Sequence, residues 1–242
     1  MSEQADLFAP GVSEAWAPAT TSPVDDVRHR LSRSGPAALD EGDTLALLLV
    51  RCLNPGSDPV EMAEVLLARF GGIARIVGAP EPELARVVGA RAARELGLLH
   101  SLLLRALEHP LRQRPVLASS EAVKTYLRAR LTALPREVFH VLFLDRKNQL
   151  IADERMSEGT VGHAPVYPRE VVRRALELSA SGLLLAHNHP SGDPQPSGAD
   201  VEMTRQVVAA ARALDIVVHD HLVVGGDQVA SLRGLGLVEA GR

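Results

Sequence analysis

The chain has 242 residues, 46% of them hydrophobic and 23% charged, which is the composition of a folded globular protein. Its formal net charge of -4 argues against a protein whose whole surface binds nucleic acid. A single cysteine, Cys52, excludes an internal disulfide framework and a zinc site built on thiolates. The first residues lack a signal-peptide pattern, and no apolar run reaches the ~20 residues that span a bilayer. We therefore expect a soluble, cytoplasmic protein with no membrane partner.

Changes in composition divide the chain into four parts. Residues 1–24 contain Pro, Ala, Ser and Thr without periodicity, which predicts a disordered tail. Residues 25–109 show helical apolar spacing and predict a small all-α domain. Residues 110–120 contain two prolines and predict a linker. Residues 121–242 interleave strand and helix patterns, which predicts an α/β domain with a mixed sheet flanked by helices.

Local signals predict where the helices of the first domain begin and end. Asp58 followed by Pro59 is typical of a helix start, with an N-cap and a proline at the first helical position. Gly71 is typical of the end of that helix. A longer helix is predicted from about Ala90 to Leu107, ending before Pro110.

In the second domain, the segment 137–145 is apolar on both faces and is followed by a turn and a second strand pattern over 150–156, which predicts a hairpin. Residues 183–186 predict a short buried strand, and Ser197 is expected to begin a helix. A last hairpin is predicted over residues 216–232.

The strongest chemical signal comes from two histidines and an aspartate around a Gly/Pro-rich loop. His187 and His189 are two residues apart, so on an extended chain both imidazoles point to the same side, with Cα atoms ~6.6 Å apart. Two ring nitrogens can then bind one ion at ~2.0–2.1 Å, and the loop can return Asp200 as a third ligand. Two histidines and one carboxylate with a fourth position open are typical of a catalytic zinc site. The sequence therefore predicts one zinc ion per chain.

Asp200 also has a purely structural interpretation. Ser197-x-x-Asp200 before an apolar helical pattern is similar to a capping box, with Ser197 as the N-cap and Asp200 three residues into the helix. The two interpretations are compatible, because a helix start can orient a carboxylate and expose it to a metal.

The remaining histidines carry weaker signals. His219 and His221 share the ligand spacing but lie inside an apolar strand pattern, with no third donor at a following helix start. The structural interpretation of this pair is therefore favoured, with Asp220 and His221 as partners that orient a ligand histidine. His140 and His163 are isolated in the sequence and are predicted to be structural or surface residues.

The spacing His-x-His-Pro, six residues, Ser, two residues, Asp resembles the JAMM (MPN+) metalloprotease motif. The wider sequence is similar to the bacterial RadC family, closely over residues 115–235 and loosely over 28–108. The segments that carry this resemblance are Arg136-Glu-Val-Phe, Phe143-Leu-Asp, Gly159-Thr, Pro168-Arg-Glu-Val, Ala186-His-Asn-His-Pro-Ser-Gly-Asp and Asp220-His-Leu-Val-Val-Gly. The resemblance implies an MPN-type α/β domain behind a small helical domain.

The resemblance also implies roles for individual residues. His187, His189 and Asp200 match the zinc ligands of the motif. Glu154 best matches the upstream glutamate, whose task would be to take a proton from zinc-bound water and pass it to the leaving nitrogen. Zinc lowers the pKa of such a water to about 7, so hydroxide is available at neutral pH.

The same resemblance bears on the roles of four nearby residues. Asp153 should point to the opposite strand face and Glu158 lies nearer the turn, so both are weaker candidates for the base than Glu154. Ser197 would donate a hydrogen bond to the developing oxyanion in addition to any capping role. Asn188 stands where eukaryotic relatives have Ser or Thr, as in RadC sequences, and receives no separate role.

The helical region resembles the helix-hairpin-helix segment of the family, whose Gly-x-Gly turn presents backbone N–H groups to DNA phosphates. This sequence departs from that pattern, because Val87-Val88-Gly89 keeps only the second glycine and a β-branched valine does not readily adopt positive φ. Residues 25–115 contain twelve arginines and twelve acidic residues, so charge does not favour DNA either. DNA binding by this region is disfavoured.

Two functions of different classes follow from these observations. The favoured one is a zinc-dependent hydrolase of peptide or isopeptide bonds, acting on a peptide or protein substrate with Glu154 as general base. The alternative is a DNA-associated accessory or repair protein that uses the MPN domain as a scaffold. An inactive MPN scaffold is less favoured because every motif position is present. The sequence indicates neither the substrate nor the oligomeric state.

Overall fold

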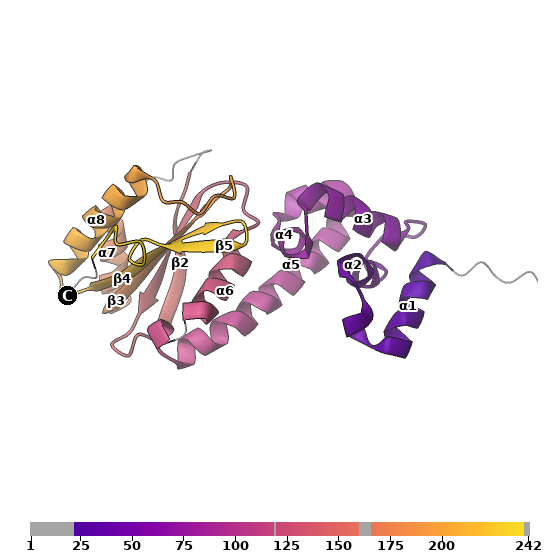
Figure 1. Cartoon of the computed structure of the whole chain (residues 1–242), viewed down its shortest axis with the longest axis horizontal. Coiled ribbons are helices and arrows are strands. Elements are labelled where there is room, and N and C mark those ends of the chain that lie inside the picture. The colour runs from indigo at the N-terminus through magenta and orange to yellow at the C-terminus, as the bar shows by residue number, and fades with distance from the viewer. Residues whose placement is uncertain (1–21, 119, 160–165, 240–242) are drawn as a thin grey trace, which may run out of the picture.

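A computed structural model describes residues 22–118, 120–159 and 166–239, and shows an α/β protein. A helical region comes first, and a five-stranded mixed sheet with flanking helices follows it (Figure 1). The predicted fold class is therefore confirmed. The predicted tail lies outside the described residues up to residue 21, but its end was placed too late, because the first helix begins at Pro23 and buries Val24.

The helical region consists of five α-helices and two short 3-10 turns within residues 22–118. At the start of α3, the Asp58 carboxylate accepts a hydrogen bond from the Val60 N–H at 2.8 Å, and Gly71 ends the helix at φ 82°, as predicted. No helix among the described residues is long and apolar enough to cross a membrane. The helices are α1 (Pro23–Ser34), α2 (Glu41–Leu49), α3 (Pro59–Phe70), α4 (Ile73–Gly78) and α5 (Glu81–Gln113), with turns at Pro36–Ala38 and Val116–Ala118.

Helix α5 differs from the prediction at its C-terminal end. The helix is broken at Gly89, where φ is 80°, but it then continues through Pro110 to Gln113. A proline this close to the end removes only one hydrogen bond, and burial of the next residue, Leu111, offsets that loss. The segment 110–120 is therefore partly helical and contributes to a core, contrary to the irregular linker predicted. The division of the chain into domains stays a prediction.

The second region builds one sheet with the strand order β2-β1-β3-β4-β5. Strands β3 and β4 are parallel, and the other neighbours are antiparallel. The elements are α6 (Ser120–Leu131), β1 (Val138–Leu144), β2 (Leu150–Glu158), α7 (Pro168–Glu177), β3 (Gly182–His189), α8 (Gly198–Arg212), β4 (Val217–Gly225) and β5 (Gln228–Ser231).

Strand β3 is longer than the sequence pattern predicts. It was expected to end at Ala186, yet it extends to His189 because its partner β4 continues beside it as far as Gly225. The two histidines of the motif therefore lie on the last residues of a paired strand rather than on a loop. This pairing fixes the direction of both imidazoles.

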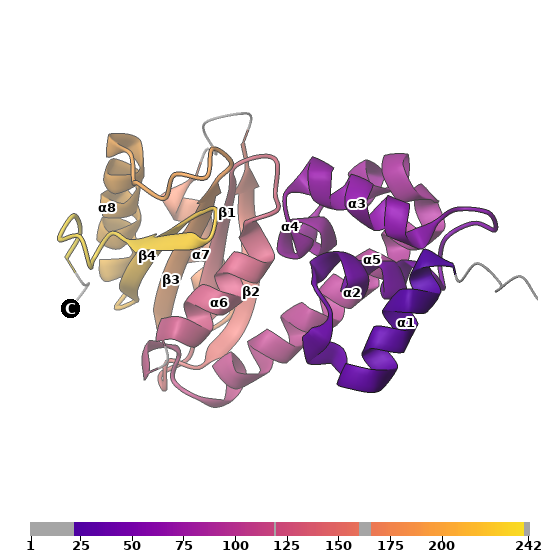
Figure 2. The same ribbon diagram turned by 45° about the vertical axis from the view of Figure 1, so that its right-hand side comes forward.

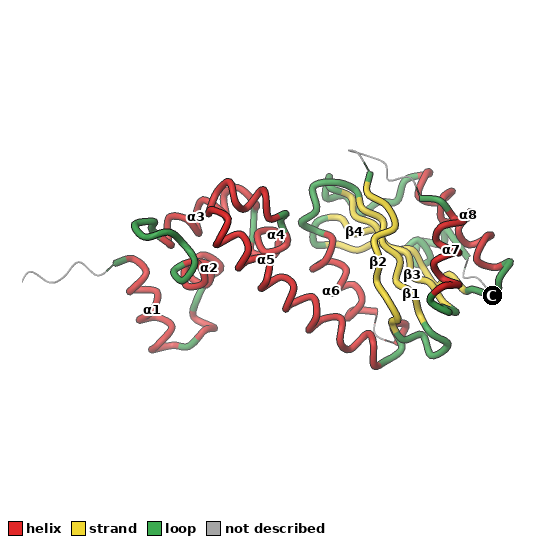
Figure 3. The backbone as a smooth tube through the Cα atoms, turned by 180° about the vertical axis from the view of Figure 1, so that it is seen from behind, coloured by secondary structure: helices red, strands yellow, loops and turns green. Residues whose placement is uncertain are grey.

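The two faces of the sheet bury separate cores. Figure 3 shows the sheet with α6 on one side and α7 and α8 on the other. Residues such as Phe139, Val141 and Phe143 pack toward α7 and α8, whereas Leu142 and Leu144 pack toward α6, as the two-residue period of a strand requires. Odd-numbered and even-numbered residues of β1 thus face different environments.

Truncation of Phe143 to alanine should destabilise the fold strongly, because its side chain is fully buried between the sheet and α7. We expect a loss of about 3–5 kcal/mol in the free energy of unfolding, measured by urea titration. Leu176→Ala is the matched control, since 54% of Leu176 is exposed and its loss should cost under about 1 kcal/mol. Equal losses in both variants would contradict this assignment of the core.

Candidate metal centre

His187 and His189 on β3 and Asp200 in the first turn of α8 come together at one end of the sheet. Because the two histidines are two residues apart on the strand, both imidazoles lie on the α8 face. Their side chains are 1% and 17% exposed, and that of Asp200 is 13% exposed, so the cluster is sheltered but reachable from solvent.

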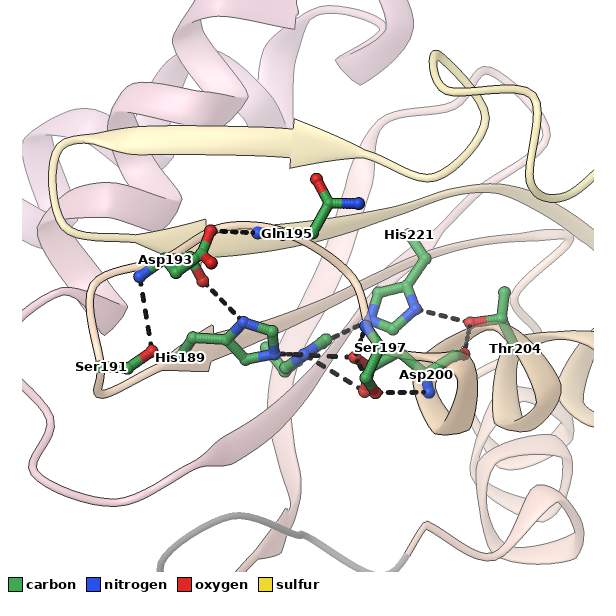
Figure 4. Close-up of polar contacts among 9 residues, drawn as sticks. His189, Ser191, Asp193, Gln195, Ser197, Asp200, Thr204 and His221 are labelled. Atoms are coloured by element: carbon green, nitrogen blue, oxygen red, sulfur yellow. Dashed lines mark hydrogen bonds and ion pairs between the residues drawn. The ribbon is translucent and has the colours of Figure 1, made fainter.

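The ligand atoms of these three residues lie at distances that suit one small cation. His187 Nε2 is 2.9 Å from His189 Nε2 and 3.4 Å from Asp200 Oδ1, and His189 Nε2 is 3.6 Å from Asp200 Oδ2. Atoms bound tetrahedrally at ~2.0–2.1 Å to one zinc ion are ~3.3 Å apart. Figure 4 shows His189 and Asp200 directed toward one another. The donor set therefore fits a divalent metal.

The start of α8 positions Asp200. Ser197 is the N-cap, and its hydroxyl oxygen accepts the Asp200 N–H, while the Asp200 carboxylate accepts the Ser197 N–H at 2.7 Å. The capping box predicted from the sequence is confirmed. One carboxylate oxygen, Oδ2, accepts from the N–H and the hydroxyl of Ser197, and Oδ1 faces His187. Asp200 can thus serve the helix and a metal together.

The loop between β3 and α8 fixes the protonation of His189. The backbone carbonyl of Asp193 lies 2.7 Å from His189 Nδ1 (Figure 4), and a carbonyl can only accept. His189 Nδ1 must therefore carry a proton, so in the neutral ring Nε2 keeps its lone pair for the site.

A longer chain of hydrogen bonds fixes the protonation of His187. The Thr204 hydroxyl donates its only proton to the carbonyl of Asp200 at 2.5 Å, so it must accept from His221 Nδ1, 2.6 Å away (Figure 4). His221 Nε2 is then bare in the neutral ring and accepts the proton of His187 Nδ1 across 2.8 Å. His187 Nε2 is consequently unprotonated and faces the site.

Two bare imidazole nitrogens and a carboxylate thus converge on one point. Lone pairs on His187 Nε2 and His189 Nε2 at 2.9 Å repel each other unless a cation or a proton lies between them. The surrounding protein holds this arrangement in place through three elements, β3, β4 and α8. The two imidazole nitrogens and the carboxylate are therefore placed to bind one cation together.

Burial and charge act differently on the three residues. Burial lowers the pKa of His187 to about 4, and burial also holds the pKa of His221 well below its usual range. The interaction with Asp200 raises the pKa of His189. Burial alone would raise the pKa of Asp200, but the neighbouring imidazoles of His189 and His187 and the hydrogen bonds from Ser197 outweigh it and hold that pKa far below its usual value. At neutral pH the site presents a carboxylate and a neutral His187.

Comparison with known families agrees with this geometry. Residues 117–237, half of the chain, match the family model described as RadC: RadC-like JAB domain. The chain belongs to the RadC family. The domain fits the MPN (JAMM) superfamily, and His187, His189 and Asp200 can form a metal site within it. The match begins after α5, so the helical region of this RadC chain lies almost entirely outside it.

Glu154, the predicted base of this RadC protein, lies on β2 and faces α7. Its carboxylate is bound by Arg174 at 2.7 and 2.6 Å, and this hydrogen bonding holds the pKa of Glu154 below its usual value. The strand register places Glu154 beside Val141 and His187 beside Phe139, on the same face and two strands apart. Standard spacings put their Cα atoms ~12 Å apart, so a bridging water or substrate would have to join them. The role of Glu154 stays a prediction.

The competing carboxylates face away from the metal centre. Asp153 points to the α6 side, as predicted, and binds Tyr126 and His140 there. Glu158 pairs with Arg136 and Arg155. His140 is buried and its Nδ1 donates to Asp153 at 2.7 Å, so the prediction of a structural residue is confirmed. His163 lies outside the described residues.

His219 and His221, the second histidine pair, have different surroundings in the structure. His221 contacts His187, as an orienting partner would, whereas Asp220 accepts hydrogen bonds from Ser231 and the Arg233 N–H on the other side of β4. The buried Nε2 of His219 has no hydrogen-bond partner among the described residues. Of the two residues predicted to orient a ligand histidine, His221 contacts His187 directly, whereas Asp220 reaches it only by accepting the His221 backbone N–H at 2.7 Å.

Two functional positions were missed by the sequence reasoning. Thr204 received no role from the sequence, where it stands among the apolar residues of α8, but it lies four residues after Asp200, where a hydroxyl can reach the Asp200 carbonyl. Asn188 was given no role, yet its buried side chain accepts the Val138 N–H and donates to the carbonyls of Leu134 and Arg136. A polar residue inside an apolar stripe was the signal available for Thr204.

Thr204→Val should weaken metal binding while leaving the fold intact. Without the hydroxyl, His221 can move its proton to Nε2 and donate to His187 Nδ1, which places a proton on His187 Nε2 at the site. We expect about a 10- to 100-fold loss of zinc affinity, measured by competition with a chromophoric chelator. Thr204→Ser keeps the hydroxyl and should bind zinc as the native chain does. Native affinity in Thr204→Val would contradict this proton order.

Gly225→Ala should displace the loop that holds His189. A Cβ at Gly225 would lie 2.5 Å from the carbonyl carbon of Asp193 and 2.8 Å from the carbonyl oxygen of Gly192, both backbone atoms. The loop must shift, and the bond from Asp193 to His189 is then lost. We expect weaker zinc binding together with a loss of stability of about 1–3 kcal/mol.

Gly97→Ala is the control, since a Cβ there meets nothing within 4 Å and α5 should tolerate it or gain up to about 1 kcal/mol. The same chelator titration measures both glycine variants. Unchanged zinc affinity in Gly225→Ala would show that the loop does not orient His189.

Proposed function

We propose that this RadC chain is a metal-dependent hydrolase of peptide or isopeptide bonds, with zinc as its metal. The observation that carries the proposal is the convergence of His187 Nε2, His189 Nε2 and an Asp200 carboxylate oxygen, with both imidazoles held in the ligating tautomer. If Asp200 served only the capping box, neither His187 nor His189 would need to be held in a particular tautomer. Three protein ligands match the number found in catalytic zinc sites, which leave a fourth position for water or substrate.

In this proposal His187, His189 and Asp200 hold the cation. When bound, it would supply Lewis-acid activation of a water and of the scissile carbonyl near neutral pH. The buried His187 and His221 exclude water from the inner side of the site, so reactants approach from the partly exposed side of His189 and Asp200. Peptide and isopeptide bonds are favoured because the motif resembles that of JAMM metalloproteases.

Glu154 is proposed to move the proton. Its low pKa keeps the carboxylate ionised at neutral pH, so its oxygens can accept a proton from the attacking water and return it to the leaving nitrogen. Arg174 holds this carboxylate in the described structure and must loosen its hold for the transfer. Ser197 is proposed to donate to the developing oxyanion, which requires its hydroxyl to turn from Asp200, 2.6 Å away.

Metal analysis and a substitution series test the proposal. The purified chain should contain about one zinc per molecule, which His187→Ala and Asp200→Ala should each remove. Glu154→Gln should keep the metal but lower hydrolysis about a hundredfold or more. The readout is mass-spectrometric comparison of the cleavage products that each variant releases from a protein extract. Chelation of the metal should abolish the products, and added zinc should restore them.

Glu202→Gln, at an exposed position of α8, is the matched control and should leave metal content and cleavage unchanged. Full cleavage by Glu154→Gln would reject that residue as the base. Full cleavage by the metal-free His187→Ala variant would reject the hydrolase mechanism as a whole.

A further inference from the structure

A groove of about 670 Å³ lies on the face of the sheet opposite the metal centre, between the helical region and β2. His140 in the groove pairs with Ala186 on β3, whereas the preceding residue, Phe139, pairs with His187, so the two histidines lie on opposite faces. Figure 2 shows α4 beside α6, and the groove runs along this junction. An adjoining hollow of about 450 Å³ shares Leu104 and Arg130 with it and continues along α5.

Arginines dominate these two hollows. Six arginines and three glutamates line them, although acidic residues outnumber Lys and Arg in the whole chain by 30 to 26. Arg136 and Arg155 share a single carboxylate, that of Glu158. Arg86 and Arg105 have no ion-pair partner among the described residues, so positive charge is left for a ligand. The arginines are Arg86, Arg105, Arg112, Arg130, Arg136 and Arg155.

The floor of the groove is a fixed polar cluster. The Asp153 carboxylate, 3% exposed, accepts hydrogen bonds from Tyr126 at 2.6 Å and from His140 at 2.7 Å and pairs with Arg130 at 2.7 Å. Since Asp153 holds His140 by Nδ1, the other edge of that imidazole is available to the groove. Arg130 Nε faces Asp153, so the inner side of this guanidinium is held by the cluster, while about a third of the side chain stays exposed in the groove.

The groove and the metal centre meet at the same end of the sheet. Asn188 lies between the two ligand histidines, and its side chain points the other way and binds the backbone of Arg136 and Val138, both of which line the groove. A chain bound in the groove can therefore pass over this strand end toward His187 and His189. An arginine-lined groove that ends at the edge of the sheet carrying the candidate metal site suits an extended ligand with several negative charges.

From these contacts we propose that the groove binds an acidic, extended peptide segment of the substrate. Guanidinium groups bind carboxylates in a bidentate fashion, and the glutamates interspersed among the arginines disfavour a continuous phosphate backbone. No Phe, Tyr or Trp lines either hollow, so bases of a single-stranded nucleic acid would find only histidine and arginine side chains to stack on. The groove proposal depends on the proposed hydrolase function in one respect only, namely that the bound peptide segment belongs to the substrate.

Direct binding tests the groove without requiring hydrolysis. Fluorescence anisotropy of a fluorescein-labelled peptide of eight glutamates is measured with the full chain, beside a Gly-Ser peptide and a single-stranded dT oligonucleotide. Arg86→Ala should raise the Kd of the acidic peptide about three- to tenfold, and Arg86→Ala combined with Arg136→Ala should raise it further. Added salt should weaken binding as well. Arg146→Ala is the matched control, because Arg146 is exposed in the turn at the far end of β1.

These binding measurements test the groove independently of hydrolysis. His187→Ala should still bind the acidic peptide, so a failed hydrolase proposal and a failed groove proposal give different results. The groove proposal is overturned if the acidic peptide binds no better than the Gly-Ser peptide, or if Arg146→Ala weakens binding as much as Arg86→Ala. Tighter binding of the oligonucleotide, with the same dependence on Arg86 and Arg136, would also overturn it and assign the groove to nucleic acid.

Discussion

The arrangement of the metal centre depends on where one proton lies. The Asp200 carbonyl can only accept, so it orients the Thr204 hydroxyl, which orients His221, which in turn leaves His187 with a bare Nε2. The first link of this chain is the backbone of the residue whose carboxylate completes the site. A shift of the N-terminus of α8, of β4 or of β3 by itself would therefore change a residue of the candidate metal site, and the fold itself selects the protonation state.

The sequence could predict those parts of the site that depend only on residues close to one another in the chain. Strand alternation aligns His187 with His189, the Ser-x-x-Asp spacing places Asp200 at a helix start, and the short Gly/Pro-rich loop between them allows the three to meet. His221 could not be placed in that way. It reaches His187 only through the parallel pairing of β3 with β4, whose register depends on the whole sheet.

The same limit explains two features that local sequence patterns did not reveal, the partner of His140 and the true end of α5. His140 looked isolated because its partner, Asp153, lies on the other arm of a hairpin whose register shifts beside it. The end of α5 was placed at Pro110 because local propensity favours a break there, yet burial of Leu111 against the sheet core outweighs that preference. Tertiary packing overrides local signals in both cases.

The pairing of Glu154 with Arg174 sets a condition on any catalysis. A carboxylate bound by two arginine nitrogens is ionised but a poor proton acceptor, since protonation would break the pair. Arg174 also contacts Glu177 on its own helix at 2.9 Å, so it has a second carboxylate to hold if it releases Glu154. Moving Arg174 from Glu154 to Glu177 would cost less free energy than leaving the arginine without a carboxylate partner. A substrate that draws Arg174 toward Glu177 would at once free the base and raise its pKa, so that substrate binding and base activation become one event.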